Sequence, residues 1–370
     1  MGDLRLQRTS SDSFYGDYLY EHIVPEGHFL RQLRDLVPWQ RFTYRLLKYY
    51  RGKGQVGRPP IDPAILLKML LLSYLYELSE RQVEEFCDYF LPAKYFIGLA
   101  IDGKAPDHST LTLFKKRILE NGKLRAYERM LGQIVSIAQE AGIAFGPIQL
   151  VDSTHSIADV DLAKERHRDD DDRGPRDPGA RWGCKGVYTF HDAEGQTHRQ
   201  RKYFYGYKLH ASFNVGAQMI TGVKVSSGNH HDGAYLCPLI QGDLAQGLPL
   251  TTCVADRGYD DTAIHFQLQQ WGIRNAIHLV RARTKKKDAN KKVWQRLKAE
   301  PWYQAALQTR YQIERKFGEA KLHHGLRRCR YLTLERYGIQ AYLTAMALNL
   351  KQLVSKLSGV SLRGPTPIRA

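Results

Sequence analysis

The sequence predicts an α/β fold in two parts, an all-helical N-terminal domain and a domain built on a mixed sheet flanked by helices. Length is the first observation, because 370 residues exceed one ordinary domain and favour about two. Composition is the second, because hydrophobic residues make up 43% of the chain, which is enough for a packed core. Periodicity is the third: apolar residues recur at helical spacing up to residue 141 and in short strand-like runs after it.

Helix-start signals define the first domain, residues 1–141. Asp62 and the proline after it match an N-cap followed by a first-turn proline. Ser79 and Gln82 have the spacing of a capping box. Asn121 and the glycine after it interrupt a later helical pattern and precede a further amphipathic helix. Short capped helices occur both in DNA-reading helix-turn-helix modules and in bundles used for packing or dimer contacts, and the pattern does not separate the two.

The second domain, residues 142–357, is expected to alternate strands and helices. Its expected elements are a strand at 148–151, a hairpin of strands at 203–215 and 219–225, a helix at 235–245, a strand at 251–255, a helix at 262–271, a strand at 275–280 and a long helix from about 302. Three strands suited to antiparallel pairing, followed by helix, strand, helix, strand and helix, are the order of an RNase H-like fold. The polar stretch near 159–200 is expected to be a flexible loop, and 358–370 a tail.

Charge and cysteine content indicate the partner and the compartment. The chain has 55 Lys and Arg against 38 Asp and Glu, a net charge of +17. A folded protein this basic is typical of one that binds a polyanion, most commonly nucleic acid. Five cysteines without a Cys-x-x-Cys pair argue against a disulfide framework and predict a cytoplasmic protein. The strongest apolar run, 63–76, is too short for a bilayer span, so no membrane association is expected.

Acidic residues at two strand ends are candidates for catalysis. Asp152 and Asp256 each follow a short apolar strand, a position that holds a carboxylate rigidly at a cleft, although turn or N-cap aspartates give the same pattern. Arg310, Glu314 and Lys321 are spaced by four and seven residues, which places all three on one face of a helix. An exposed ion pair between Arg310 and Glu314 would give the same spacing.

Four motifs follow one another along the chain, at Val151–Thr154, Phe204–His210, Ala255–Tyr259 and Arg310-x3-Glu314-x6-Lys321. Together they resemble bacterial insertion-sequence transposases of the DDE class, in the group named for its Tyr-Arg-Glu-Lys motif. The segment 58–111 resembles the helical domain that accompanies this catalytic domain, and the resemblance extends from about 40 to 355. One position departs from the motif, because Leu307 stands three residues before Arg310, where the group has Tyr.

The resemblance implies a catalytic triad of Asp152, Asp256 and Glu314 that binds Mg²⁺ or Mn²⁺, as two ions. Oxygen-only ligands suit these ions, and two of them about 4 Å apart serve phosphodiester transfer. The implied activity is cleavage at transposon ends followed by strand transfer into target DNA. The implied partners are double-stranded DNA, as terminal inverted repeats and as target, and a second copy of the chain in a homodimer. The helical domain would then bind DNA ends, mediate dimerisation, or both, and the protein would be nucleoid-associated in a bacterium.

Basic residues near the third carboxylate are expected to hold DNA. Arg310 and Lys321 would bind phosphates, the first as a fork of donors and the second as a point charge. A lysine-rich link is expected to contact the DNA backbone, although a solvated charge run is the alternative; its members are Lys285, Lys286, Lys287, Lys291 and Lys292. Three further residues in the motifs are accessory candidates: His210, Arg257 and Tyr259. Two other functions fit the same residues, a metal-dependent nuclease or resolvase on this fold and a domesticated DNA-binding protein without catalysis.

Overall fold

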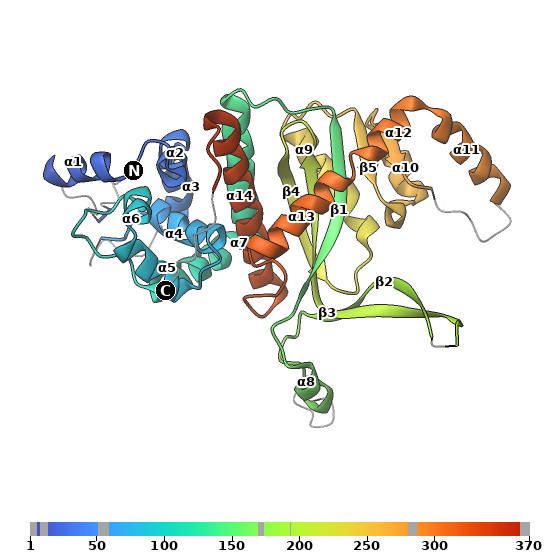
Figure 1. Cartoon of the computed structure of the whole chain (residues 1–370), viewed down its shortest axis with the longest axis horizontal. Helices are drawn as coiled ribbons and strands as arrows, with labels where there is room; N and C mark the ends of the chain where they lie inside the picture. Colours follow the sequence, from blue (N-terminus) through green and yellow to red (C-terminus); the bar gives the residue numbers. More distant parts are fainter. Residues whose placement is uncertain are drawn as a thin grey trace. The chain divides into compact units, whose positions relative to one another are not determined.

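The computed structural model describes residues 6–7, 14–50, 59–168, 174–192, 194–279 and 287–362 (Figure 1). Contacts between residues divide the chain into two compact units. Unit 1 consists of Met1–Ala141 and Tyr342–Ala370, and unit 2 of Gly142–Ala341. The division after residue 141 falls at the expected domain boundary. Residues 342–357, which the sequence analysis placed in the second domain, are grouped with the first.

Unit 1 is all-helical in its described residues, as the sequence predicted. Its helices are α1 (Phe14–Ile23), α2 (Phe29–Leu36), α3 (Gln40–Leu47), the short η1 (Lys48–Tyr50), α4 (Pro63–Leu75), α5 (Glu80–Tyr89), α6 (Leu91–Ile97), α7 (His108–Glu140) and the part of α14 (Leu334–Ser358) that follows residue 341. The expected apolar helix is α4, and all of its side chains are buried. Within the described residues, no helix combines the length and the hydropathy that a membrane span requires.

Caps confirm the predicted helix starts in unit 1. Asp62 accepts a hydrogen bond at 2.8 Å from the backbone N–H two residues later, and Ser79 with Gln82 forms a complete capping box before α5. The break expected at Asn121 lies slightly later, because Lys123 inside α7 has φ 49° and ψ −161°. α7 is therefore two helical segments joined at a kink.

Unit 2 is built on a six-stranded mixed sheet. Its strands are β1 (Ile148–Ile157), β2 (Arg181–His191), β3 (Thr197–Asn214), β4 (Met219–Ser227), β5 (Thr252–Ala255) and β6 (Arg274–Ile277). β4, β3 and β1 are antiparallel neighbours, whereas β1, β5 and β6 are parallel neighbours. Three antiparallel strands followed by two parallel strands reached through helices give the predicted RNase H-like order, and this fold class is confirmed.

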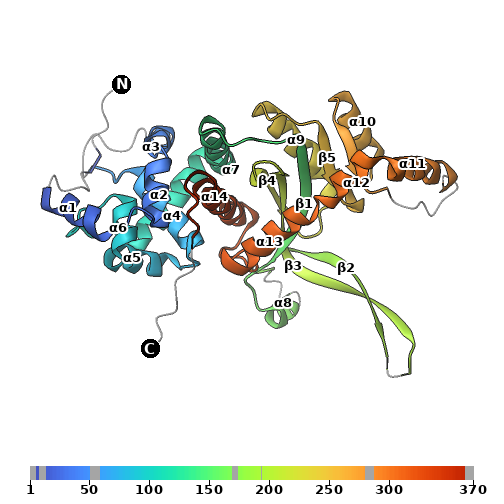
Figure 2. The ribbon, with the colours of Figure 1, turned by 45° about the horizontal axis from the view of Figure 1, so that its top comes forward.

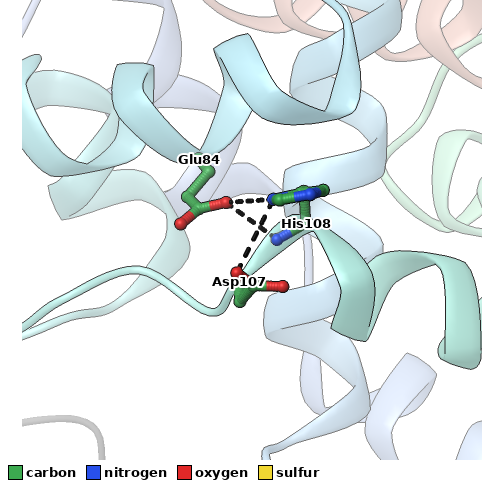
Figure 3. A group of neighbouring side chains, drawn as sticks. All are labelled: Glu84, Asp107 and His108. Carbon is green, nitrogen blue, oxygen red and sulfur yellow. Dashed lines mark hydrogen bonds and ion pairs between the residues drawn. The ribbon is translucent and has the colours of Figure 1, made fainter.

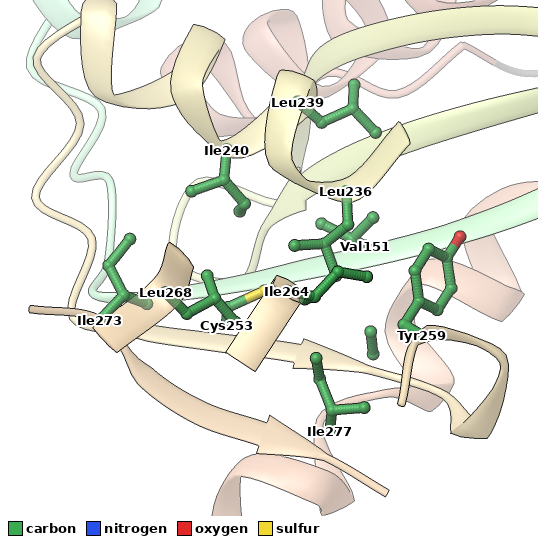
Figure 4. Close-up of a cluster of buried hydrophobic side chains, with 11 residues drawn as sticks. Val151, Leu236, Leu239, Ile240, Cys253, Tyr259, Ile264, Leu268, Ile273 and Ile277 are labelled. Carbon is green, nitrogen blue, oxygen red and sulfur yellow. The ribbon is translucent and has the colours of Figure 1, made fainter. Parts of the chain in front are cut away.

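The helices of unit 2 are α8 (Leu162–Arg168), the short η3 (Asp232–Tyr235), α9 (Leu236–Ala245), the short η4 (Arg257–Tyr259), α10 (Thr262–Gln270), α11 (Lys287–Ala299), α12 (Pro301–Gln308) and α13 (Tyr311–His323). Among them, α9, α10, α12 and α13 contact strands of the sheet. A buried apolar cluster joins α9 and α10 to the sheet and includes Val151 and Ala255 (Figure 4). Because strand side chains alternate between faces, Asp152, which follows Val151, and Asp256, which follows Ala255, point to the other face. α13 contacts β1, and α12 contacts β5.

Two expected elements differ from the structure. The strand expected at 148–151 continues to Ile157, because its second half also pairs with β3. Asp152 therefore lies inside β1 rather than at its end, just beyond the last residue of β1 that pairs with β5. The long helix expected from residue 302 is two helices, α12 and α13. At their junction Thr309 donates its hydroxyl to the carbonyl of Ala306, a local bond that competes with the helical pattern.

The stretch near 159–200, expected to be a flexible loop, forms regular secondary structure in its described residues. It contains α8 and then a two-stranded ribbon made by β2 and the first part of β3 (Figure 2). β-branched and aromatic residues at 187–190 favour the strand, and Asp192 closes the turn by accepting the backbone N–H groups of Glu194 and Gln196. The consecutive aspartates at 169–172 lie outside the described residues.

Candidate active site

Strand register places Asp152 and Asp256 side by side. The last parallel pair between β1 and β5 joins Leu150 to Val254, and each aspartate follows its member of that pair by two residues. A step of two residues keeps a side chain on the same face of the sheet. The intervening Val151 points into the core beneath α9 and α10, so both carboxylates lie on the face of α12 and α13.

Backbone donors hold one oxygen of each aspartate. Oδ1 of Asp152 accepts the N–H of Ser153 at 2.8 Å, and Oδ1 of Asp256 accepts the N–H of Gly258 at 2.7 Å. Asp256 is the N-cap of η4, which turns the chain away immediately after β5. These bonds fix the two carboxyl groups and leave Oδ2 of each outside them.

Helix α13 supplies the third carboxylate. Nη2 of Arg310 lies 2.7 Å from Oε1 of Glu314 and 3.8 Å from Oδ2 of Asp152, so one guanidinium connects the first and third acids. The side chain of Asp152 is 12% exposed and that of Glu314 is 53% exposed, which makes the site buried on the sheet side and open on the helix side. Nε of Arg310 is buried and has no hydrogen-bond partner among the described residues.

The three carboxylates interact electrostatically. Burial raises the pKa of Asp152 to about 7, and the negative charges of Asp256 and Glu314 add to the rise. The N–H of Ser153 and the positive charge of Arg310 act on this pKa in the opposite direction. The structure therefore brings the three acids of the predicted triad close enough to repel one another. The positive charge of Arg310 partly offsets this repulsion.

The triad is more open than the tightest group of potential metal ligands. Among the described residues, that group is Glu84, Asp107 and His108 in unit 1, whose ligand atoms lie within 4.8 Å of one another (Figure 3). Oε2 of Glu84 accepts the backbone N–H of His108 and lies 2.8 Å from its Nδ1, while Asp107 caps α7 by accepting the N–H of Ser109. These atoms serve the start of α7, and the group carries no resemblance to the DDE motifs.

Lys321 and Glu319 occupy different surroundings on α13. Burial and the positive charges of Lys185 and Arg327 lower the pKa of Lys321 to about 8. Glu319 pairs with Lys316, whose Nζ lies 3.0 Å from its Oε2, because residues three apart share a helix face.

Two accessory candidates lie near the aspartates but on the opposite side of the sheet. Tyr259 packs into the core beneath α9 and α10 (Figure 4). His210 pairs across the strands with Ser153, and its Nε2 lies 2.8 Å from the hydroxyl of Ser226. Burial lowers the pKa of His210 to about 3, so the ring is neutral and makes a structural hydrogen bond. The third candidate, Arg257, is exposed in η4.

The lysine-rich link is described only in part. Lys285 and Lys286 lie outside the described residues. Lys287 begins α11, and Lys291 belongs to the same helix, but neither side chain is described. Lys292 is exposed on α11. The proposed contact of these lysines with DNA therefore remains a prediction.

His278 is a site residue that the sequence analysis missed. β5 and β6 pair in parallel up to Ala255 and Ile277, so the next residues, Asp256 and His278, are neighbours. Burial and the positive charges of Arg257 and Arg310 lower the pKa of His278, while Asp256 raises it. Its position in the sequence could have indicated this, because His278 directly follows the strand β6 just as Asp256 directly follows β5.

Comparison with known families accounts for most of the chain. Residues 18–117 match the family described as Transposase domain (DUF772). Residues 147–350 match the family described as Transposase DDE domain. The second match contains all three acids of the triad together with Arg310 and Lys321.

Among solved structures, the chain is similar to transposases at low identity. A cryo-EM structure of the piggyBac transposase synaptic complex with hairpin DNA has 10% identity and a TM-score of 0.42, over 95% of this chain and 78% of that one. A Mos1 mariner paired-end complex with Mn has 11% identity and a TM-score of 0.22, over 88% and 90%. The family assignment rests on the sequence matches. Because the DDE match spans more than half of the 370 residues, the chain belongs to the family of transposases with a DDE domain.

Proposed function

We propose that the protein is the transposase of an insertion sequence, which cuts DNA at transposon ends and transfers the cut strands into target DNA. Asp152, Asp256 and Glu314 are its proposed catalytic acids. One observation carries the proposal: two aspartates in register on parallel strands share a face of the sheet with a glutamate, and Arg310 links the first acid to the third. Acids gathered so that they repel one another are typical of a functional site.

The donor chemistry of this site suits Mg²⁺ or Mn²⁺. The acids offer only oxygen ligands, which these hard cations prefer. Burial and, less strongly, repulsion from Asp256 and Glu314 raise the pKa of Asp152, and a divalent cation would relieve that repulsion. The Oδ2 atoms of Asp152 and Asp256 lie outside the backbone hydrogen bonds that orient the two groups. When bound by the three acids, two such ions would activate the attacking oxygen and stabilise the leaving one.

Residues of the chain itself bind and orient the DNA in this proposal. Arg310 has an Nε–H without a partner among the described residues, and its planar fork suits phosphate oxygens. Burial and, after it, neighbouring cations destabilise the positive charge of Lys321, and an approaching phosphate would stabilise that charge. Backbone N–H groups keep Asp152 and Asp256 in place, so these acids need little reorganisation as the strand is cut.

The proposed substrate is double-stranded DNA, as terminal inverted repeats and as target. The net charge of +17 supports a polyanionic partner. Unit 1 is proposed to bind DNA ends, to mediate dimerisation, or both, and the active form to be a homodimer. A protein with this substrate would work beside the nucleoid in the bacterial cytoplasm.

A strand-transfer assay tests the proposed function. Purified full-length protein would be incubated with Mg²⁺, a labelled duplex carrying the inverted repeat that flanks its gene, and a supercoiled target plasmid. We expect nicked or cut ends and labelled strands joined covalently to the plasmid. Cleavage without joined products would identify a nuclease or resolvase instead. Binding without either product would identify a non-catalytic DNA-binding protein.

A further inference from the structure

A ribbon of two strands leaves the sheet of unit 2 and carries side chains that the site does not use. β2 and the first part of β3 pair from Gly186 with Lys202 to His191 with Thr197 (Figures 1 and 2). These six pairs span about 17 Å at roughly 3.4 Å per residue. All twelve paired residues are exposed, so neither face of the ribbon covers a core.

The two faces of the ribbon differ in chemistry. Residues that pair across antiparallel strands share a face, and successive pairs alternate between faces. Arg201 pairs with Val187, and Arg199 with Thr189, which places both arginines on one face. The other face has aromatic rings, where Phe190 lies 5.9 Å from Tyr188 and 5.3 Å from His198 between ring centroids.

The cations of the ribbon lack anionic partners in the described part of the chain. Among the described residues, none forms an ion pair or side-chain hydrogen bond with Lys185, Arg199, Arg201 or Lys202. The nearby Asp192 is already engaged, because it caps the turn and lies 2.5 Å from Nε2 of His198. Exposed arginines that share one face of the ribbon, with no anion of the described chain against them, suit a polyanion better than an apolar protein surface.

A bulge immediately before the six ribbon pairs carries a further lysine. Lys185 is the extra residue between the pairs of Cys184 and Gly186, and such bulges redirect a side chain. Burial, and after it the positive charge of Lys185, lowers the pKa of Lys321 on α13, so the two cations act on each other electrostatically. Lys321, Lys185, Lys202 and Lys208 all act in the same way on His155, whose pKa falls to about 4, mainly through burial.

We infer that this ribbon is a DNA-binding arm. Arg199 and Arg201 would bind phosphates of duplex DNA beside the cut site, farther along the duplex than the phosphates bound by Lys321. This inference rests on the proposed function. A two-stranded ribbon fits the major groove of B-DNA. Its length corresponds to about five base pairs at roughly 3.4 Å per step. The arm enlarges the duplex footprint beyond what the cations of α13 reach.

A pair of matched double variants tests the arm. Arg199→Gln with Arg201→Gln removes two charges, whereas Arg199→Lys with Arg201→Lys keeps them in the same exposed positions. Binding of full-length protein to a labelled random-sequence duplex would be measured over a series of salt concentrations. We expect the Gln variant to bind on the order of tenfold more weakly near 0.1 M salt and to lose about 1.8 from the slope of log affinity against log salt. The Lys variant should keep most of both.

Each alternative outcome has a distinct meaning. If the unmodified protein binds no DNA, the proposed function itself fails. If that protein binds and the Gln variant binds equally well with an equal slope, only the arm is overturned. If the Gln variant changes self-association in sedimentation and leaves DNA affinity intact, the ribbon binds a second copy of the chain, and the inference is again overturned. Circular dichroism of each variant would establish that the fold is retained.

Discussion

The two faces of the central sheet each hold a buried aspartate, and their surroundings distinguish the proposed catalytic acid from a structural one. Burial raises the pKa of Asp152, on the face of α13, and that of Asp243, on the face of α9, to about 7. Asp243 accepts hydrogen bonds from Ser212 at 3.1 Å and from Gln149 at 2.9 Å, one at each oxygen. Asp152 has one oxygen held by backbone and the other 3.8 Å from Arg310.

A raised pKa alone therefore does not locate an active site in this protein. The neutral donors around Asp243 saturate its oxygens and tie α9 to the sheet. Asp152 is instead surrounded by two other acids and one arginine. One positive charge does not balance three carboxylates, so the site favours a further cation. Saturated oxygens indicate a structural role, and unsaturated oxygens beside like charges indicate a binding role.

The largest expected effect separates these two aspartates by activity. Asp152→Asn should reduce cleavage and strand transfer on the order of 10²–10³-fold or more, because it removes an acid from the charged centre. Asp243→Asn should retain most activity, since its side chain does not face that centre. Product formation by the two purified variants in Mg²⁺ measures the contrast. An inactive but folded Asp243→Asn protein beside an active Asp152→Asn protein would reverse the assignment.

A second test compares two acids on one helix. Glu314→Gln should abolish both reaction steps while leaving binding to DNA ends largely intact, because Glu314 shares Arg310 with Asp152. Glu319→Gln should keep most activity, since its partner Lys316 lies on a different side of α13. Labelled transposon ends allow binding and cleavage to be scored for both variants. An inactive Glu319→Gln variant together with an active Glu314→Gln variant would contradict the proposed triad.

A third test measures stability, and here the larger effect is expected at Asp243 rather than at Asp152. Asp243→Ala removes one hydrogen-bond partner from each of the buried side chains of Gln149 and Ser212, which should lower the free energy of unfolding by about 1–3 kcal/mol. Asp152→Ala should cost less, and it relieves repulsion with Asp256 and Glu314. Urea denaturation at neutral pH compares the variants. An equal loss in both would mean that Asp152 also acts mainly as a structural residue.

The smallest expected effect is a pH dependence of stability from Asp243. The folded protein keeps this acid protonated up to about pH 7, whereas the unfolded chain ionises it near the usual aspartate pKa of 3.8. Its contribution to stability is therefore complete below that value and is lost as pH rises towards 7. Asp243→Asn should flatten this decline in thermal unfolding scans between pH 4 and pH 7. An unchanged slope would show that other groups cause it.

Local rules were sufficient for much of the fold. Asp62 and Ser79 cap helices where residue type and spacing indicated, because capping depends on neighbours within one turn. The order of strands followed from short apolar runs and also placed Asp256 correctly after β5. Arg310 and Glu314 meet as their spacing of four residues required.

Longer-range pairing decided the features that the sequence analysis missed. Residues 153–157 contain too many polar side chains to predict a strand, yet β3 pairs with all of them. The ribbon escaped notice because both of its faces are exposed, so no apolar alternation marks it. His278 became visible only through the register between β5 and β6, which a single sequence does not specify.

Helix α14 has a consequence for the order in which the protein can fold during synthesis. Its residues from Tyr342 onward belong to unit 1, together with Met1–Ala141, although the 200 residues of unit 2 lie between them in the chain. A ribosome therefore delivers all of unit 2 before it delivers the segment that completes unit 1. Domains generally fold as they emerge from the ribosome. Unit 2 should therefore fold first, and unit 1 should complete its fold only after residues from Tyr342 onward have been synthesised. Translation that stops before residue 342 would release a finished sheet and an unfinished helical unit.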